Sequence, residues 1–513
     1  MTFNSQEIIH DTRTEFEDLL KFVTGEQART AKADSIERGL FKMLLSLGAK
    51  LLQLFFVMRS ETCSRQPVQS KSGQELPYHR DIGCVYFSIF GKVCIERPYF
   101  YKQGVDTQIP LDAELGLGDD SYSDLLREIT EYLAVYHVYG GKKVGLLERL
   151  FGFNLSTRAL QQNVGEDSAN VEAYYAQKLP PGPESEANIL VIQADGKGIP
   201  MVLEEEEMAE GRVRLGKGQK HGHKKEAIVT TVYTISAMPR TPEEVIASFF
   251  AENEPPKVPS KASKPQNKQI WATLDGKDAA LSRLSQQVVL REGTHILHRV
   301  ALCDGCEALQ SRIGLQFKGF ILILDFVHAN EYLWDAANSL LGETSDKRLE
   351  WVKSRTLQIL SGQTPQVIAD LRLTAKLKTT KVSPRKQLTQ TANYFERNSP
   401  FMDYKTYLAN GYPIASGVIE GACRHFVKDR FELSGMRWLQ TGAENLLHLR
   451  AVAENDDWDE YYAYRREQRQ LRLYGHPAAI KQPIESQVIN SQPLTQPLAS
   501  NCHSKHSQLP LAV

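Results

Sequence analysis

Three short apolar runs in the middle of the chain each end on an aspartate. The runs, each with the aspartate that follows it, are residues 189–194 with Asp195, residues 299–303 with Asp304, and residues 320–324 with Asp325. Runs of this length and composition are typical of strands buried in a sheet. Because ligands and metals bind at the carboxyl ends of such strands, we expect these carboxylates to lie at the mouth of a sheet.

Two other side chains extend this pattern. His328 follows Asp325 by three residues, and Glu420 lies in a probable helix within the segment Gly-Val-Ile-Glu-Gly at 417–421. A single Asp-Gly pair is typical of a turn, and a single helical glutamate of a solvated surface. Strand-end aspartates together with a helical glutamate favour a divalent-metal site for phosphoryl chemistry, because clustered carboxylates without a cation repel one another.

The residues leave the exact ligand set open. Asp195, Asp304 and Glu420 form the first hypothesis, because the strands ending at Asp195 and Asp304 are expected to pair. Asp325 is the alternative second ligand, since it also ends a strand and periodicity does not rank the two. His328 either orients a ligand, relays a proton, or caps the helix that follows.

The order of elements around these residues predicts the fold class. A Pro-, Gly- and Glu-rich linker at 179–186 marks a boundary. After it we expect a strand at 189–194 continuing as a hairpin through 198–203, a strand at 226–236, a proline-rich connector at 239–268, a helix at 278–291, the strand ending at Asp304, a short helix near 308–315, the strand ending at Asp325, and a helix at 329–341. This is the order of a ribonuclease-H-like α/β fold with a mixed five-stranded sheet. We expect the core to span 187–465, with a helical insertion at about 340–410.

Residues 1–80 are predicted to form a mainly helical N-terminal region. Asp34 or Ser35 is the expected cap of a helix that is apolar at three- and four-residue steps. The longest apolar segment, 40–58, contains Lys42 and Lys50, which favours a buried helix over a membrane span.

Residues 81–180 combine a predicted β-hairpin with a possible DNA-binding motif. The hairpin is expected at 84–101, where aromatic and β-branched residues alternate around Gly91-Lys92. Residues 142–150 and a longer helix at 157–178, capped by Ser156, resemble a helix-turn-helix, in which Arg158, Gln161 and Gln162 are exposed candidates for DNA contact. The alternative is an ordinary helical hairpin in a bundle.

Composition places any nucleic-acid contact in local patches, because the formal net charge is only −1. Trp438 is a candidate for stacking on a base, and the alternative is a core tryptophan. The seven scattered cysteines suit a reducing cytoplasm, and Cys303-x-x-Cys306 has no partner motif for zinc. The tail at 477–513 is rich in Gln, Pro and Ser and is predicted to be disordered. The basic candidates for DNA contact are Arg158, Lys224, Lys225, Arg424, Lys428 and Arg437.

Four short motifs, in their order along the chain, resemble the ISKra-type transposases of bacterial insertion sequences. They are Ala-Asp-Gly-Lys-Gly at 194–198, Leu-Asp-Phe-Val-His-Ala at 324–329, Gly-Val-Ile-Glu-Gly at 417–421 and Gly-Met-Arg-Trp at 435–438. The resemblance implies a DDE transposase with Asp195 as first acid, Asp304 as second, Glu420 as third, and Asp325 with His328 as an accompanying Asp-x-x-His signature. It also implies Mg²⁺ (or Mn²⁺) as cofactor, double-stranded DNA of element ends and target as partner, and a homo-oligomer in the active complex.

The hypothesis that follows is a cytoplasmic bacterial DNA transposase, nucleoid-associated when bound to DNA, that cleaves and transfers strands and has no membrane partner. Two other hypotheses are a DNA-binding protein descended from such an enzyme without its catalysis, and a ribonuclease-H-like nuclease that hydrolyses without joining. Intact acids at every position favour the enzyme.

Overall fold

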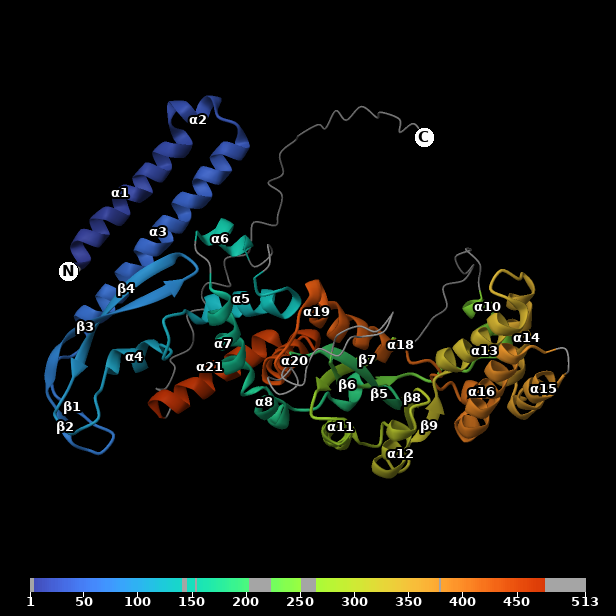
Figure 1. Cartoon of the computed structure of the whole chain (residues 1–513). Coiled ribbons are helices and arrows are strands. Elements are labelled where there is room, and N and C mark those ends of the chain that lie inside the picture. The colour runs from blue at the N-terminus through green and yellow to red at the C-terminus, as the bar shows by residue number, and fades with distance from the viewer. Residues whose placement is uncertain are drawn as a thin grey trace, which may run out of the picture.

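The structure, a computed structural model, describes residues 4–140, 145–152, 155–202, 223–250, 264–377 and 380–475. Its centre is a mixed five-stranded sheet with the strand order β7-β6-β5-β8-β9 (Figure 1). β5 pairs antiparallel with β6 and parallel with β8, while β6–β7 is antiparallel and β8–β9 is parallel. The chain is therefore an α/β protein. The strands are β5 (Ile189–Pro200), β6 (Lys224–Ile235), β7 (Gln266–Thr273), β8 (His298–Cys303) and β9 (Ile321–Leu324).

Helices cover both faces of the sheet. On one face, buried residues of α11 (Lys277–Arg291) and α12 (Glu307–Gln316) pack on Leu190, Ile192 and Ala301. On the other face, α13 (Phe326–Leu341) packs on the strands at the β8–β9 side. Helix α20 (Gln440–Glu454) packs on β7 at the opposite side of the sheet. Burial of strands on both faces explains their nearly continuous apolar sequences.

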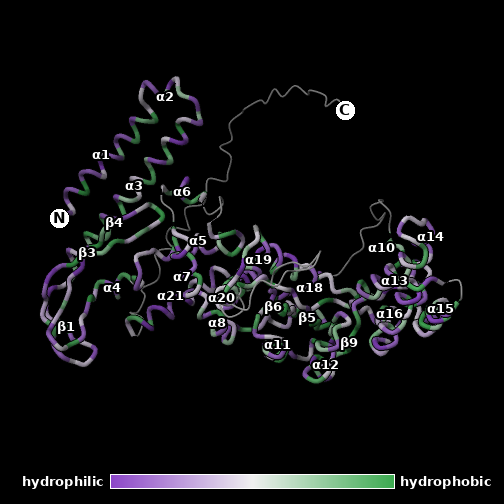
Figure 2. Tube along the Cα trace, in the orientation of Figure 1, coloured by the Kyte–Doolittle hydropathy of each residue, from purple (hydrophilic) through white to green (hydrophobic). Residues whose placement is uncertain are grey.

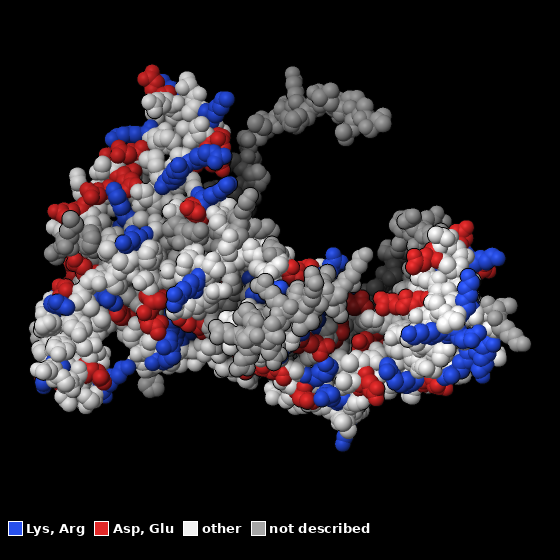
Figure 3. Space-filling view, in the orientation of Figure 1, with Lys and Arg blue, Asp and Glu red and all other residues white. Residues whose placement is uncertain are grey.

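Further helices lie between β9 and the segment that carries Glu420. α14 (Lys347–Leu360), α15 (Thr364–Lys376), α16 (Val382–Asn398) and α17 (Tyr404–Ala409) share one hydrophobic core with α13 and β9. In Figure 3, Lys and Arg side chains gather over the part of the molecule that holds α15 and α16. Exposed basic residues of this part are Lys376, Lys381, Arg385, Lys386 and Lys405.

The N-terminal region is a helical hairpin joined to a β-hairpin. α1 (Ser5–Thr24), α2 (Glu26–Thr30) and α3 (Ala33–Thr62) extend away from the central sheet in Figure 1. β3 (Tyr78–Ser88) and β4 (Gly91–Phe100) pair antiparallel and pack against α3 through a small apolar core. Helix and hairpin are thus where the sequence predicts them.

The burial of α3 differs from its prediction. We expected a buried helix, but only Phe56, Val57 and Ser60 are buried, because α1 and the β-hairpin are its main packing partners. Its first turn also differs, since the helix begins after Lys32 and neither Asp34 nor Ser35 caps it. By length and composition alone, α3 is the one helix of the described ranges that is apolar enough to cross a membrane.

The helices before the sheet are held to the C-terminal helix by buried ion pairs. The helix at the C-terminal end is α21 (Trp458–Tyr474). The helices before the sheet are α4 (Pro110–Leu115), α5 (Asp124–Tyr136), α6 (Leu146–Phe151), α7 (Thr157–Ser168) and α8 (Val171–Gln177). Arg127 on α5 pairs with Asp167 on α7 at 2.8 Å, and Arg465 on α21 pairs with the same carboxylate at 2.6 Å. Burial and the charge of Asp167 raise the pKa of Glu131, which accepts a hydrogen bond from Tyr462. The Tyr461 hydroxyl also donates to the Asp167 carbonyl, 294 residues away in sequence, so α21 is held to α7 by both kinds of contact.

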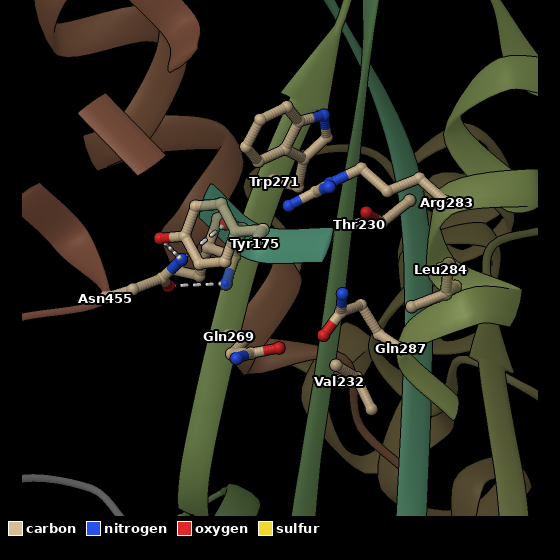
Figure 4. A pocket seen from close by; sticks show the side chains of 10 residues that line it. Tyr175, Thr230, Val232, Gln269, Trp271, Arg283, Leu284, Gln287 and Asn455 are labelled. Atoms are coloured by element: carbon tan, nitrogen blue, oxygen red, sulfur yellow. Dashed lines mark hydrogen bonds between the residues drawn. The ribbon is translucent and has the colours of Figure 1, made fainter. Parts of the chain in front are cut away.

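A small cavity lies where α8, α11 and β7 meet (Figure 4). The guanidinium of Arg283 lies 3.4 Å from the ring centroid of Trp271 and 5.0 Å from that of Tyr175. The cavity measures about 20 Å³, so it holds one water at most and no organic ligand. Arg283 therefore acts as a packing residue that joins helix and sheet through its contact with the aromatic rings.

Two strand predictions need correction. Residues 198–200 continue β5 and do not form a second strand, because Gly196 and Gly198 let the strand run past Asp195 while paired with β6. The fifth strand is β7, which lies partly inside the expected proline-rich connector. β7 begins with the polar residues Gln-Asn-Lys-Gln at the edge of the sheet. Because only its second half is apolar, the sequence pattern does not indicate a strand here.

The helix-turn-helix prediction is also modified. Ser156 caps α7 as predicted, accepting a hydrogen bond from the Ala159 amide. The helix expected at 157–178 is two helices, because α7 ends at Ser168 and α8 begins at Val171. Residues 142–144 and 153–154, and the tail predicted at 477–513, lie outside the described residues.

Candidate functional site

The sheet register places the three predicted aspartates at one level. Ala194 pairs with Cys303 across the parallel β5–β8 ladder, and Cys303 pairs with Leu324 across β8–β9. Each of Asp195, Asp304 and Asp325 directly follows one of these residues. Since neighbouring strands lie about 4.8 Å apart, the aspartates form a row with Asp304 in the middle.

Asp325 is the most buried member of the row. It is the N-cap of α13, where its Oδ1 accepts a hydrogen bond from the Val327 amide at 2.7 Å. Its other carboxylate oxygen accepts a hydrogen bond from the Ser416 hydroxyl. Burial raises the pKa of Asp325 to about 6, with the nearby Glu420 adding to the increase against the opposing effects of the Val327 amide and His328. The site thus holds a carboxyl group that resists ionisation when no cation is bound.

A candidate metal centre lies beside Asp325. Asp325, His328 and Glu420 each offer a ligand atom, and these atoms all lie within 4.8 Å of one another. Within the described ranges, no other group of three or more His, Cys, Asp or Glu residues meets this criterion. Two carboxylates and an imidazole at this spacing can surround a single divalent cation.

Glu420 reaches Asp325 because of the segment that carries it. α18 (Gly417–Ala422) follows Ser416, whose hydroxyl lies 3.3 Å from Glu420 Oε1 as well as bonding Asp325. The Phe326 amide donates to the Ile414 carbonyl at 2.9 Å, which fixes this segment against the start of α13. Ser416 therefore contacts both carboxylates. It stands four residues before Glu420, a spacing that brings two side chains together on a helix, but the sequence does not indicate its contact with Asp325.

The chain around Glu420 is not a uniform α-helix. Residues Cys423–Lys428 form a π-helix, a rare element found mostly as single turns and often at functional sites. Arg424 and Lys428, two of the basic candidates for DNA contact, lie in this π-helix, and both side chains are exposed. Cys423, at the start of the π-helix, donates a hydrogen bond from Sγ to Asp195 Oδ2 at 3.3 Å.

His328 lies close to Asp325 and lines the same cavity as Asp304. Burial lowers its pKa, but the charges of Asp325, Glu331 and Asp304 more than offset this, and the net shift is upward. Its Nδ1 lies 3.0 Å from Glu331 on the same helix. Asp325, and not His328, caps α13, so the capping alternative for this histidine is set aside.

Asp195 and Asp304 stand beside this cluster but outside the group of three. Asp304 accepts hydrogen bonds from the Cys306 amide at 3.0 Å and from the Cys303 thiol at 3.6 Å. The Gly196 amide bonds Asp195 Oδ1 at 2.6 Å. Burial raises the pKa of both Cys303 and Cys423, so these thiols remain neutral donors toward the aspartates. The sequence analysis did not single out Cys423, and nothing in its spacing marks it.

A polar cavity of about 880 Å³ opens next to Asp304 and His328. Its walls are α13 and α16, and its largest feature is a stacked pair formed by Tyr332 and Tyr394, whose ring centroids are 3.7 Å apart. The Arg397 guanidinium donates to the Gly305 carbonyl at the same end as Asp304. The other lining side chains are Cys306, Asp335, Gln387, Gln390 and Asn393.

The predicted DNA-contact residues lie in two places. Arg158 and Arg437 are exposed and border one cavity of about 540 Å³, which Gln161 and Gln162 also line. Trp438 borders it as well but is only 7% exposed, and its indole donates to the Phe431 carbonyl at 3.1 Å. This burial favours the core alternative for Trp438. Lys224 pairs with Glu432, and Lys225 donates to Gln440 at 2.7 Å.

Fold and site together define an α/β protein with a row of strand-end acids and a cluster of two carboxylates and a histidine. No protein-family model matches the chain, and no curated protein matches it either. Among solved structures, it is similar to the Drosophila P element transposase strand transfer complex, with 9% sequence identity and a TM-score of 0.24 over 71% of this chain and 84% of that one. A TM-score this low carries no argument about fold or function.

Proposed function

We propose that the chain is a metal-dependent DNA transposase with a ribonuclease-H-like core. The observation that carries the proposal is the row of Asp195, Asp304 and Asp325 at one level of three neighbouring parallel strands, with Glu420 brought to its edge by a distant helix. Acids gathered at strand ends suit the binding of divalent cations for phosphoryl transfer. The mixed five-stranded sheet, and the pairing of the strands that end at Asp195 and Asp304, agree with the sequence prediction.

The residues present fit a divalent cation. The charges of Asp325 and Glu420 repel each other at short range, and burial raises the pKa of Asp325, so a bound cation relieves an unfavourable arrangement. Asp325, His328 and Glu420 would hold one ion, and Asp195 with Asp304 would complete a second site. The sequence predicts Asp195, Asp304 and Glu420 as the ligands, with Asp325 as the alternative to Asp304. Mg²⁺ suits the oxygen ligands, and Mn²⁺ is also accepted by such donors. When bound, such ions activate the attacking oxygen and stabilise the leaving one.

The chain's own residues position the carboxylates and leave room for a DNA strand. Ser416 holds Asp325 and Glu420 in place, and Cys423 holds Asp195. The cavity between α13 and α16 begins at Asp304 and His328 and is lined by amides and a stacked tyrosine pair, which suits a polar polymer leaving the site. The charged side chains that line it are the acids Asp304 and Asp335 and the base Arg397, with His328 beside them.

Exposed cations near the site supply phosphate contacts in this proposal. Arg424 and Lys428 project from the π-helix that follows Glu420, and Arg437 lies with Arg158 at the cavity bordered by α7. With a net charge near zero, DNA affinity rests on such local groups and depends on salt.

The experiment that tests the proposal is a strand-transfer assay on a supercoiled plasmid that carries the DNA flanking this gene. With Mg²⁺ we expect nicked plasmid and joined products, and with EDTA neither. Binding without nicking would support the non-catalytic DNA-binding alternative, and nicking without joined products would support the nuclease.

Five single variants assign the acids in the same assay. Asp195→Asn, Asp304→Asn, Asp325→Asn, Glu420→Gln and His328→Ala are compared side by side for nicking and for DNA binding. We expect Asp195→Asn and Glu420→Gln to abolish nicking while DNA binding remains. Loss of nicking in both Asp304→Asn and Asp325→Asn would support the arrangement with two ions, and loss in only one of them would assign that residue as the second ligand. Persistent cutting by both Asp195→Asn and Glu420→Gln would reject the proposal.

A further inference from the structure

The cavity that opens at Asp304 is bounded by α13 and α16, which pack together. Each helix contributes side chains at steps of three and four residues, so each set lies on one face of its helix. The sets include His328, Tyr332 and Asp335 on α13, and Gln387, Gln390 and Tyr394 on α16. Figure 2 shows that hydrophilic residues recur along α16. Along this helix the lining extends from Arg397, at the Asp304 end, to Gln387, about 15 Å away at about 1.5 Å per residue.

A pair of stacked tyrosines lies between the two ends of the cavity. The rings of Tyr332 and Tyr394 have centroids 3.7 Å apart and planes inclined by 11°. Tyr394 is buried and lies against the loop that follows Asp304, where a side chain at Gly305 would collide with its ring. Tyr332 is half-buried and lines the cavity, so part of its ring is accessible to a ligand. An aromatic ring fixed in this way is a platform on which a nucleobase stacks.

Amide side chains on α16 line the cavity beside the tyrosines. Among the described residues, no hydrogen-bond partner occupies the side chain of Gln387 or Gln390, whereas the Asn393 side chain accepts from Arg372 at 3.1 Å. An amide offers donors and an acceptor together, and the Watson–Crick edge of a base presents the same combination. The two glutamines are therefore suited to hydrogen bonding with base edges.

The charges of the cavity favour bases over phosphates. Arg397 is the only lysine or arginine among the described residues that line it, while Asp304 and Asp335 are acidic. A groove that follows a DNA backbone needs several cations, because every phosphate is negatively charged. A duplex also keeps its Watson–Crick edges paired and its base faces stacked, so neither the glutamines nor the tyrosine reach them. The lining therefore suits unpaired nucleotides and not a duplex.

We propose that the cavity between α13 and α16 binds a short unpaired stretch of DNA, with its bases toward Tyr332 and the glutamines and its phosphates toward solvent. The proposal rests on the proposed function, because the cavity begins at Asp304. It adds the class of substrate, a strand separated from its complement beside the reacting phosphate. The exposed Arg397, which donates to the Gly305 carbonyl, supplies one cation for the phosphate at this end.

The test measures binding of the full chain to a fluorescent single-stranded oligonucleotide and to the duplex of the same sequence. Both are measured in EDTA, so that binding is observed without metal-dependent cleavage. Tyr332→Ala is expected to raise the dissociation constant for the single strand at least about fivefold, and Tyr332→Phe to restore it, because the ring stacks and the hydroxyl does not. The affinity for the duplex is expected to stay the same in both variants.

Gln390→Leu tests the glutamines while the stacked rings remain. We expect it to weaken single-strand binding by about two- to tenfold, the effect of one or two lost hydrogen bonds. Since no cation is removed, this factor is expected to be the same at low and high salt. The matched control is Gln366→Leu, an exposed glutamine of α15 outside the cavity, which is expected to change nothing.

A photochemical crosslink locates the bound strand. A single-stranded oligonucleotide that carries one 5-iodouracil is irradiated with the natural chain in EDTA, and the crosslinked peptides are identified by mass spectrometry. We expect a peptide that contains Tyr332 or Tyr394. The crosslink needs no variant, so it also decides the matter should Tyr332→Ala fail to fold.

Three results would overturn the proposal. They are a natural chain that does not bind the single strand, variants that leave its affinity unchanged or lower the affinity for the duplex equally, and crosslinks confined to peptides outside the cavity. None of these measurements depends on cleavage. A chain that nicks and joins DNA but fails them keeps the proposed function without this site, and a chain that passes them without nicking supports the site without the proposed catalysis.

Discussion

The thiol of Cys423 donates a hydrogen bond to the carboxylate of Asp195, with Sγ and Oδ2 3.3 Å apart, although 228 residues separate them. The bond ties the π-helix that follows Glu420 to the first strand of the sheet. A buried neutral thiol that contacts a proposed ligand is a positioning group, because burial and the charge of Asp195 raise its pKa and keep it protonated.

Replacing Cys423 tests this positioning role. Cys423→Ala removes the donor and is expected to lower the nicking rate at least about tenfold, whereas Cys423→Ser keeps a donor and is expected to recover most of the rate. Plasmid nicking measures both, and Cys84→Ala in the β-hairpin is the control for loss of a partly buried thiol. Equal losses in the serine and alanine variants would show that the hydrogen bond is not what matters.

Asp325→Asn separates stability from metal binding. In the metal-free protein at pH 8, removing this charge is expected to raise the free energy of unfolding by about 2–3 kcal/mol, since burial raises the pKa to about 6 from 3.8 and each pKa unit is worth about 1.4 kcal/mol. Asparagine keeps the N-cap of α13. The same change is expected to abolish the rise in melting temperature caused by Mn²⁺. Glu343→Gln, an exposed acid just beyond α13, is the control. A full Mn²⁺ response in Asp325→Asn would exclude this residue as a ligand.

The metal affinity of the site is expected to depend on pH between 5 and 7. A cation must displace the proton of Asp325 below about pH 6, and protonated His328 is not a ligand, so affinity falls by at least about tenfold per unit as pH drops. The sign for stability is opposite. Both groups have raised pKa values, so the metal-free folded state binds more protons than the unfolded state and loses stability as pH rises through this range. Calorimetric titration with Mn²⁺ checks the first statement, and flat affinity across pH 5–7 would contradict it.

Arg424→Ala with Lys428→Ala tests the proposed phosphate contacts. Both side chains are exposed on the π-helix, so we expect weaker DNA binding on all sequences alike and a shallower salt dependence, the slope falling by about one for each phosphate that the variant no longer neutralises. Fluorescence anisotropy over a range of salt concentrations measures both. Lys376→Ala with Lys405→Ala, an exposed basic pair on other helices, is the comparison. Unchanged affinity and slope would place the DNA elsewhere.

Arg127→Met tests the buried ion pairs that join the helices before the sheet to α21. Its removal leaves Asp167 with Arg465 alone and takes from Glu131 its paired arginine, and is expected to lower the free energy of unfolding by about 3–5 kcal/mol. The control is Arg472→Met, whose pair with Asp119 is exposed and worth less than about 1 kcal/mol. Urea denaturation followed by circular dichroism compares the two, and equal losses would contradict the role of burial.

The apolar runs were sufficient to predict the strands that end at Asp304 and Asp325, because strands buried on both faces leave a nearly unbroken hydrophobic signal. The same signal predicted β5 too short, because the apolar run stops at Ala194 while the strand continues through Asp195 to Pro200. β7 escaped prediction because its polar first half follows prolines. Which acids approach one another depends on Ser416, which contacts Asp325 and Glu420, and on Cys423 of the π-helix, which contacts Asp195. No local sequence pattern indicates these long-range contacts.

In the sequence, Asp325 and His328 precede the helices α14 to α17, and Glu420 follows them. Ser416 follows Asp325 by 91 residues. A nascent chain that has emerged only as far as the start of α13 holds the three aspartates but neither Ser416 nor Glu420. On the proposed function, the polypeptide cannot cut DNA until translation has passed this point, so synthesis of the helices itself delays the appearance of activity.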